Sequence, residues 1–220
     1  MNNRTTVTLI VLLLIGIPFV YAAWLYPSLP SVIPIHFNFR GEADGFGPKD
    51  SIFIAPGILG AASLFVYFVL ANAKSLDPKR YEKVETSVLR NFAVVMTGFL
   101  TCLSIVILFA STHPGTPINK ILLPLLGFGF LGLGVYMPKF EQNYFAGLRF
   151  PWTLENENNW KATHLYAGKL WKMGGLVIIV FTIILPPVAG FVTFITITAS
   201  LVIASALFSY RMFKNGNQVK

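Results

Sequence analysis

The stretch VTLIVLLLIGIPFVYAAWL (residues 7–25) decides the class of fold, because it contains no Asp, Glu, Lys, Arg or His. A helix crosses about 30 Å of hydrocarbon with roughly 20 apolar residues. Five more uncharged apolar runs follow, at residues 52–71, 92–110, 121–137, 173–185 and 188–210. The sequence therefore predicts an all-α polytopic membrane protein, a bundle of six transmembrane helices that forms a single integral membrane domain over residues 1–220.

The overall composition agrees with this class. The chain is 55% hydrophobic and 12% charged, whereas a soluble domain carries about 25% charged residues. The lipid bilayer is therefore the first partner that we expect. Cys102 is the only cysteine, which excludes an intramolecular disulfide and a multi-cysteine metal cluster.

The distribution of basic residues predicts which side each loop faces. With the N-terminus inside, 14 of the 17 Lys and Arg residues lie on the cytoplasmic side and three, Arg40, Lys49 and Lys120, on the other. Such a bias in short loops sets the orientation of a membrane protein. We therefore expect cytoplasmic N- and C-termini, and the net charge of +8 needs no nucleic-acid partner to explain it.

The fifth span is the shortest, since residues 173–185 lie between Lys172 and the Pro186-Pro187 pair. A stretch of this length is compatible with a re-entrant segment. A re-entrant segment would move the basic C-terminal tail outside and weaken the charge bias. We therefore expect a longer transmembrane helix, with Lys169 and Lys172 snorkelling towards the headgroups.

Residues 74–90 are expected to form a cytoplasmic loop with an amphipathic helix. Asp77 and Pro78 are suited to the N-cap and the first position of a helix. Tyr81, Val84, Val88 and Phe92 would then share one face.

An extracytoplasmic loop spans residues 26–50. Ile35, Phe37 and Phe39 alternate with polar residues, which predicts an extended segment. The Asp44-Gly45 pair, with Gly41 and Gly47, is expected to turn the chain into a short hairpin. The loop is richer than a connector requires, so we assign ligand-binding residues to it: His36, Asn38, Arg40, Gly41, Asp44 and Gly45.

The second rich loop, residues 138–172, is expected on the cytoplasmic side. Because the segment contains Gly147 and Pro151, we do not expect a continuous helix there. Asn156 is suited to cap a helix that runs into the fifth span. Trp160 and His164 would lie on one face of that helix, four residues apart, with Ala167 and Trp171 farther along.

The aromatic residues of this loop suggest two roles. Trp152, Trp160 and Trp171 are expected at headgroup depth as part of an aromatic belt. The Arg149 guanidinium either stacks on a neighbouring ring and reads a carboxylate, phosphate or carbonyl, or pins the loop to Glu155 or to lipid. His164 is expected to bond to the loop around Arg149.

Several classes of function lack their motifs. The sequence contains no HExxH, GxSxG or metal-ligand spacing, so we expect no enzymatic activity, cofactor or metal. The six spans carry no ionisable residue of the kind that coupled transporters bury. Glycines 127, 129, 132 and 134 indicate close helix packing, and the prolines in spans one, two and four indicate breaks that could permit movement.

Two stretches resemble one family of bacterial membrane proteins. IPIHFNFRGEADGFGPK (33–49) resembles the loop after its first helix, and NYFAGLRFPWTLENENNWKATHLYAGKLW (143–171) resembles the signature of the SdpI family. That family is named for a membrane immunity protein against a secreted peptide toxin. The signature positions correspond to Asn143, Gly147, Arg149, Pro151, Trp152, Thr153, Trp160, Thr163 and His164. Phe150 stands where the family pattern has a small hydroxyl residue.

The resemblance implies a multi-pass protein of the bacterial plasma membrane. It implies immunity to, or sensing of, a secreted membrane-active peptide toxin, with a relay to a cytoplasmic transcriptional repressor. A transporter or flippase of small molecules or lipids is the alternative that the sequence leaves open.

Overall fold

A computed structural model describes residues 4–76, 78 and 86–216. Within these residues six long helices are present: α1 (Arg4–Leu25), α2 (Ile54–Ala71), α4 (Thr86–Thr112), α5 (Asn119–Tyr136), α7 (Glu157–Ile184) and α8 (Pro187–Gly216). Each is long and apolar enough to cross a membrane. The prediction of six transmembrane helices is confirmed.

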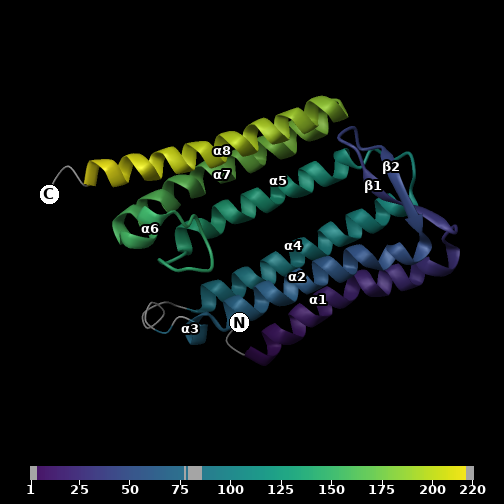
Figure 1. The fold of residues 1–220 in the computed structure, drawn as a ribbon, viewed down its shortest axis with the longest axis horizontal. Helices are drawn as coiled ribbons and strands as arrows, with labels where there is room; N and C mark the ends of the chain where they lie inside the picture. Colours follow the sequence, from purple (N-terminus) through teal and green to yellow (C-terminus); the bar gives the residue numbers. More distant parts are fainter. Residues whose placement is uncertain (1–3, 77, 79–85, 217–220) are drawn as a thin grey trace.

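Short elements gather at the two ends of the helix bundle (Figure 1). The end that carries residues 26–50, here called the hairpin end, holds η1 (Tyr26–Ser28), β1 (Val32–Phe37), β2 (Ala43–Pro48) and η2 (Lys49–Phe53). The end that carries residues 137–156, here called the loop end, holds α3 (Ala73–Leu76), η3 (Met137–Lys139) and α6 (Pro151–Glu155). Helix α1 begins and α8 ends at the loop end.

The six helices form two groups of three (Figure 1). In the first group α4 packs against both α1 and α2, and in the second α7 packs against both α5 and α8. The groups meet through α4 and α5. Both elaborated ends of the protein therefore span a junction between two helix groups.

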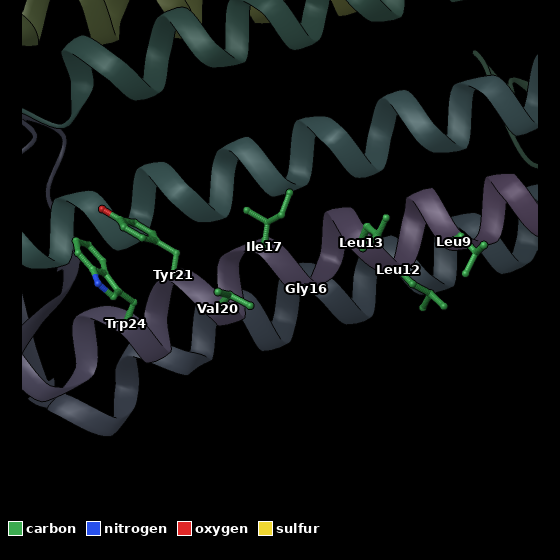
Figure 2. A pocket seen from close by; sticks show the side chains of 8 residues that line it. All are labelled: Leu9, Leu12, Leu13, Gly16, Ile17, Val20, Tyr21 and Trp24. Atoms are coloured by element: carbon green, nitrogen blue, oxygen red, sulfur yellow. The ribbon is translucent and has the colours of Figure 1, made fainter.

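Helix α1 turns an apolar face away from the other helices (Figure 2). Leu13 is 69% exposed and Val20 is 71% exposed, as expected for side chains that contact lipid. Trp24 is 74% exposed and stacks on Tyr21, with ring centroids 6.1 Å apart. The exposed Trp24 and the half-buried Tyr21, near the hairpin end, have the character of an interfacial aromatic belt.

The proline in α1 does not break the helix, which contradicts the predicted break. Pro18 lies inside a continuous α1. Because proline has no N–H, the carbonyl of Leu14, four residues earlier, loses its helical donor. The Thr101 hydroxyl of α4 donates to that carbonyl at 3.0 Å. Pro124 likewise lies inside a continuous α5.

Glycines allow α5 and α7 to pack backbone against backbone. A Cβ on Gly175 would lie 2.6 Å from the carbonyl oxygen of Gly127 and 2.7 Å from the amide nitrogen of Leu131. The packing role predicted for the α5 glycines is confirmed for all but Gly132, where a Cβ would meet nothing within 4 Å.

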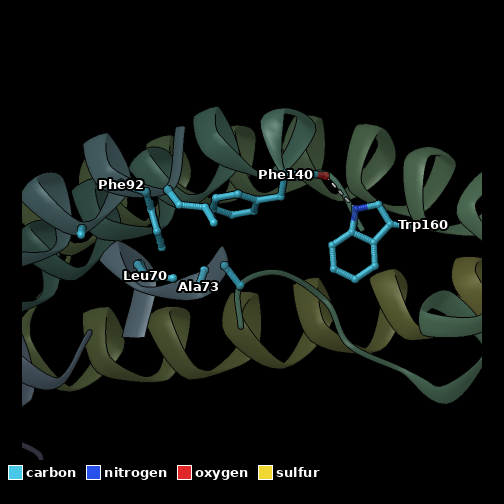
Figure 3. Packing of buried hydrophobic residues seen from close by; sticks show 8 residues of the cluster. Leu70, Ala73, Phe92, Phe140 and Trp160 are labelled. Atoms are coloured by element: carbon cyan, nitrogen blue, oxygen red, sulfur yellow. Dashed lines mark hydrogen bonds between the residues drawn. The ribbon is translucent and has the colours of Figure 1, made fainter. Parts of the chain in front are cut away.

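An aromatic cluster joins the two helix groups at the loop end (Figure 3). Phe92 of α4 packs edge-on against Phe140, with centroids 4.9 Å apart, and also contacts Tyr136. Leu70, Ala73 and Trp160 belong to the same buried cluster. Burial of this apolar surface fixes the loop that follows η3 against α2 and α4.

The fifth span is a full helix, as predicted. The Asn156 side chain caps α7 by accepting from the N–H of Asn159 at 2.9 Å. At the other end of α7, the Lys120 ammonium donates to the carbonyls of Thr182 (3.3 Å), Ile183 (2.8 Å) and Leu185. A cation at a helix C-terminus satisfies orphan carbonyls and opposes the helix dipole.

The amphipathic helix predicted within residues 74–90 lies partly outside the described residues, because Asp77, Tyr81 and Val84 are not among them. Its last part is the start of α4. There Phe92 is buried and Val88 packs partly buried against the same cluster, as the shared face predicted.

Candidate functional site

A buried asparagine organises the loop that follows η3. Asn143 is 1% exposed. Its Oδ1 accepts from the N–H groups of Phe145 and Ala146, both at 2.7 Å. Its Nδ2 donates to the carbonyls of Glu141 (2.7 Å) and Ala146 (3.0 Å). The amide thus uses both donor hydrogens and both acceptor positions inside the protein.

Gly147 and His164 form the closest contact between this loop and α7. Gly147 has φ of +113°, and a Cβ on it would overlap His164 Nε2. The N–H of Leu148 donates to that Nε2 at 2.9 Å, and His164 Nδ1 lies 2.8 Å from the carbonyl of Trp160. Since Nε2 accepts, the proton of this neutral imidazole is on Nδ1. The predicted bond between His164 and the Arg149 loop is confirmed.

Thr153 and Gln142 satisfy the backbone around the short helix α6. Thr153 Oγ1 accepts from the N–H of Phe150 and lies within hydrogen-bond distance of the carbonyl of Leu148, both at 2.9 Å. Gln142 Nε2 donates to the carbonyls of Thr153 and Leu154 at the end of α6. The hydroxyl that the family pattern places at position 150 is absent here, and Thr153 holds this turn.

Arg149 is exposed and donates to the carbonyl of Tyr144 at 2.6 Å. Of the contacts predicted for the Arg149 guanidinium, the structure shows the hydrogen bond to a backbone carbonyl. The neighbouring rings stack on each other instead, because Phe150 and Trp152 lie with centroids 5.4 Å apart at 14°. Trp152 also packs against Tyr210 of α8, which draws its ring away from Arg149.

The aromatic-belt prediction is wrong for Trp160 and Trp171, which are buried, and all three indole N–H groups have partners inside the protein. Trp160 is fully buried and donates to the carbonyl of Phe140 at 2.7 Å (Figure 3). Trp171 is 9% exposed and donates to Ser205 Oγ. Trp152 donates to Ser209 Oγ at 2.7 Å. These rings fix helices to one another rather than to headgroups.

At the hairpin end, β1 and β2 pair antiparallel, which confirms the predicted hairpin. The turn lies elsewhere than predicted, however. Asp44, Gly45 and Gly47 are strand residues, and the chain reverses at residues 38–42. Asn38 Oδ1 accepts from the N–H groups of Arg40 and Glu42, and Gly41 adopts φ of +82°. An Asx turn with a left-handed glycine has displaced the Asp-Gly turn.

The predicted outer-loop residues separate into three groups. Asn38 and Gly41 build the turn itself. His36 and Asp44 pair at 2.5 Å on the exposed face of the hairpin, and Gly45 lies beneath the His36 side chain. Arg40 lines a hollow at the junction of the helix groups, which Gly41 also borders.

The hairpin tip is attached to α5. Asn119 is 5% exposed, and its Nδ2 donates to the carbonyl of Phe39 at 2.7 Å. The Phe39 ring lies 6.3 Å from that of Phe191 in α8. The hairpin, which follows the first helix, is thus fixed to the second helix group.

The regions that match known protein families contain the two elaborated ends. Residues 139–210 match the SdpI/YfhL protein family, and residues 13–60 match a domain of unknown function, DUF1648. The immunity protein SdpI of Bacillus subtilis (strain 168) is 26% identical over 211 residues, which cover 95% of this chain and 97% of that protein. The chain thus resembles the SdpI/YfhL family in its second half and an immunity protein along nearly its whole length. No solved structure matches it significantly. It is a multi-pass protein of the plasma membrane.

The residues that correspond to the SdpI signature are brought together around the start of α7. Several polar partners were missed by sequence reasoning. Thr163 Oγ1 donates to Asn159 Oδ1 at 2.9 Å, and Asn159 Nδ2 donates to the carbonyl of Ser209 at 3.0 Å. The repeated four-residue spacing of Asn159/Thr163 and Ser205/Ser209 was the available signal, since such pairs share a helix face.

Ser209 connects two parts of this network, so Ser209→Ala should destabilise the protein by about 1–2 kcal/mol. Its hydroxyl accepts from Trp152 and lies 3.1 Å from Asn159 Oδ1. Unfolding in detergent, followed by tryptophan fluorescence, measures the change. Ser200→Ala is the control, because the exposed Ser200 hydroxyl bonds only to the Thr196 carbonyl of its own helix. Equal stability of the two variants would contradict the network.

This region offers no metal centre in the described part of the chain. Among residues 4–76, 78 and 86–216, no three His, Cys, Asp or Glu side chains lie close enough together to hold an ion. The region contains exposed cations, aromatic surface and a hydrogen-bonded loop, and these features are suited to binding a partner.

Proposed function

We propose that this protein confers immunity to a membrane-active peptide toxin and that it does so without catalysing a reaction. The observation that carries the proposal is the end-to-end similarity to an immunity protein, over 95% of the chain. The two elaborated ends support it, since a simple anchor would need neither.

We place the hairpin end outside the cell, in accordance with the bias in Lys and Arg. The exposed face of the hairpin then meets a toxin first. That face combines the His36–Asp44 pair with Val32, 55% exposed, and Phe46, 60% exposed. An apolar hollow of about 360 Å³ lies beside it, between Ile35, α2 and α4, and is large enough for an apolar side chain of a peptide.

Helix α5 provides a route from the hairpin end to the loop end. Asn119 at its start holds the hairpin tip, and Phe140 just after its end packs on Phe92 and accepts from Trp160. A toxin that prefers one position of the hairpin would shift α5 along its glycine contacts with α7. We infer that the loop end relays this shift to a cytoplasmic transcriptional repressor.

The transporter alternative gains no support from the hydroxyls of Thr97 and Thr101. The Thr97 hydroxyl donates to the carbonyl of Ala93 in its own helix, and Thr101 donates to Leu14 of α1. These groups satisfy the backbone, whereas a substrate path needs polar groups that are free to bind.

The test is the membrane potential of toxin-sensitive bacteria exposed to a depolarising peptide from the same source as this protein. Expression of the protein should preserve the potential. Phe46→Ala should weaken protection, whereas Phe128→Ala, which removes an equally exposed ring (60%) from the lipid face of α5, should not. Collapse of the potential at matched expression would overturn immunity to that peptide.

A further inference from the structure

A hollow of about 420 Å³ lies at the hairpin end, where the two helix groups meet. The hairpin contributes Phe37, Arg40 and Glu42, the connection between α4 and α5 contributes Thr116 and Pro117, and α8 contributes Pro187. Three segments distant in the sequence thus form one concave surface.

The hollow carries one cation and one anion that do not neutralise each other. Among the described residues, neither the Arg40 guanidinium nor the Glu42 carboxylate has an ion-pair partner within 4.0 Å. Glu42 accepts only a 3.3 Å bond from Asn38, and the Arg40 guanidinium lies 5.6 Å from the Phe39 ring centroid. Both charges remain available to a ligand.

We place the hollow at the depth of the headgroup region, because it lies at the ends of membrane-spanning helices. It is lined by the connection that follows α4, which ends at Thr112, and by the first residue of α8. Apolar surface continues from it along α8, where Val188 is 43% exposed and Val192 is 57% exposed. A ligand with a polar head and acyl chains could occupy both surfaces at once.

We propose that this hollow binds the headgroup of a zwitterionic aminophospholipid. The planar Arg40 guanidinium would donate to the phosphate, and the Glu42 carboxylate would accept from the ammonium group. Because the hollow has one charge of each sign, it favours a zwitterion over an anionic headgroup. The acyl chains would follow Val188 and Val192 of α8. This site is independent of the proposed immunity.

The experiment is native mass spectrometry of the purified full chain with equimolar phosphatidylethanolamine and phosphatidylglycerol of identical acyl chains. The wild type should retain phosphatidylethanolamine roughly tenfold more, the gain of about one charge-assisted hydrogen bond. Arg40→Gln should lower retention of both lipids, and Glu42→Gln should remove the preference between them.

Asp44→Asn is the matched control, because it removes a charge from the same hairpin outside the hollow. It should bind lipid as the wild type does. Phosphoethanolamine, the headgroup without chains, should compete only weakly, which distinguishes a lipid from a soluble source. Equal retention of both lipids by the wild type, or unchanged retention by Arg40→Gln at equal thermal stability, would overturn the proposal.

Discussion

Gly147→Ala should destabilise the protein by roughly 2–6 kcal/mol. An L-residue at φ of +113° is strained by about 1–3 kcal/mol. The added Cβ would also overlap His164 Nε2 and break its bond to the N–H of Leu148, which leaves a buried group unsatisfied at a further ~1–3 kcal/mol. Unfolding in detergent measures the loss, and faster tryptic cleavage after the exposed Arg149 should accompany it.

Gly115→Ala separates the two causes. Gly115 has φ of +96°, yet a Cβ on it would meet nothing within 4 Å. This variant should therefore show only the strain. In a His164→Ala background, Gly147→Ala should cost less than in the wild type, because the overlapping imidazole is gone and only the strain and a 3.2 Å contact with the Trp160 ring remain. Equal losses for Gly147→Ala and Gly115→Ala would contradict the contact with His164.

Gly175→Ala should lower the stability by about 2–4 kcal/mol, because its Cβ would press on backbone atoms of α5. The carbonyl oxygen of Gly127 would lie at 2.6 Å and the amide nitrogen of Leu131 at 2.7 Å. Backbone in a helix cannot move aside as a flexible side chain can, so the two helices must separate and lose packing along their length.

Gly132→Ala is the matched control for this second prediction. It makes the same change in α5, where a Cβ would meet nothing within 4 Å. Alanine is the better helix former by about 0.5–1 kcal/mol, so this variant should be neutral or more stable. Thermal unfolding of both variants in the same detergent compares them. A stabilised Gly175→Ala would show that α5 and α7 are not in close contact.

The helices could be predicted because their signals are local. An uncharged apolar run of sufficient length has few alternatives to a transmembrane helix. The cap at Asn156 also depends only on residues within one turn, and it was found. The uninterrupted α1 was missed, because Thr101 donates to Leu14 from a helix distant in the sequence.

The hairpin shows how tertiary contacts override a local preference. Asp44-Gly45 is a favourable turn pair on its own. The observed turn at residues 38–42 brings the Phe39 carbonyl to Asn119 of α5, a contact that the sequence pattern does not reveal. Gly41 also packs against Asn119, because a Cβ on Gly41 would lie 3.1 Å from the backbone nitrogen of Asn119.

The tryptophans were misjudged for a similar reason. Trp at the boundary of an apolar run is commonly interfacial. Trp152 and Trp171 instead find serine hydroxyls on α8, 57 and 34 residues away in the sequence. Their partners become visible only when α6 and α7 are placed against α8.

The sidedness of the hairpin tests the account most directly, because a toxin arriving from outside must reach it. Cys102 is replaced by serine, and His36→Cys or Glu155→Cys is introduced separately at an exposed position of the hairpin end or the loop end. A membrane-impermeant maleimide should label His36→Cys in intact cells and Glu155→Cys only after permeabilisation. Labelling of Glu155→Cys in intact cells, with His36→Cys protected, would contradict the account.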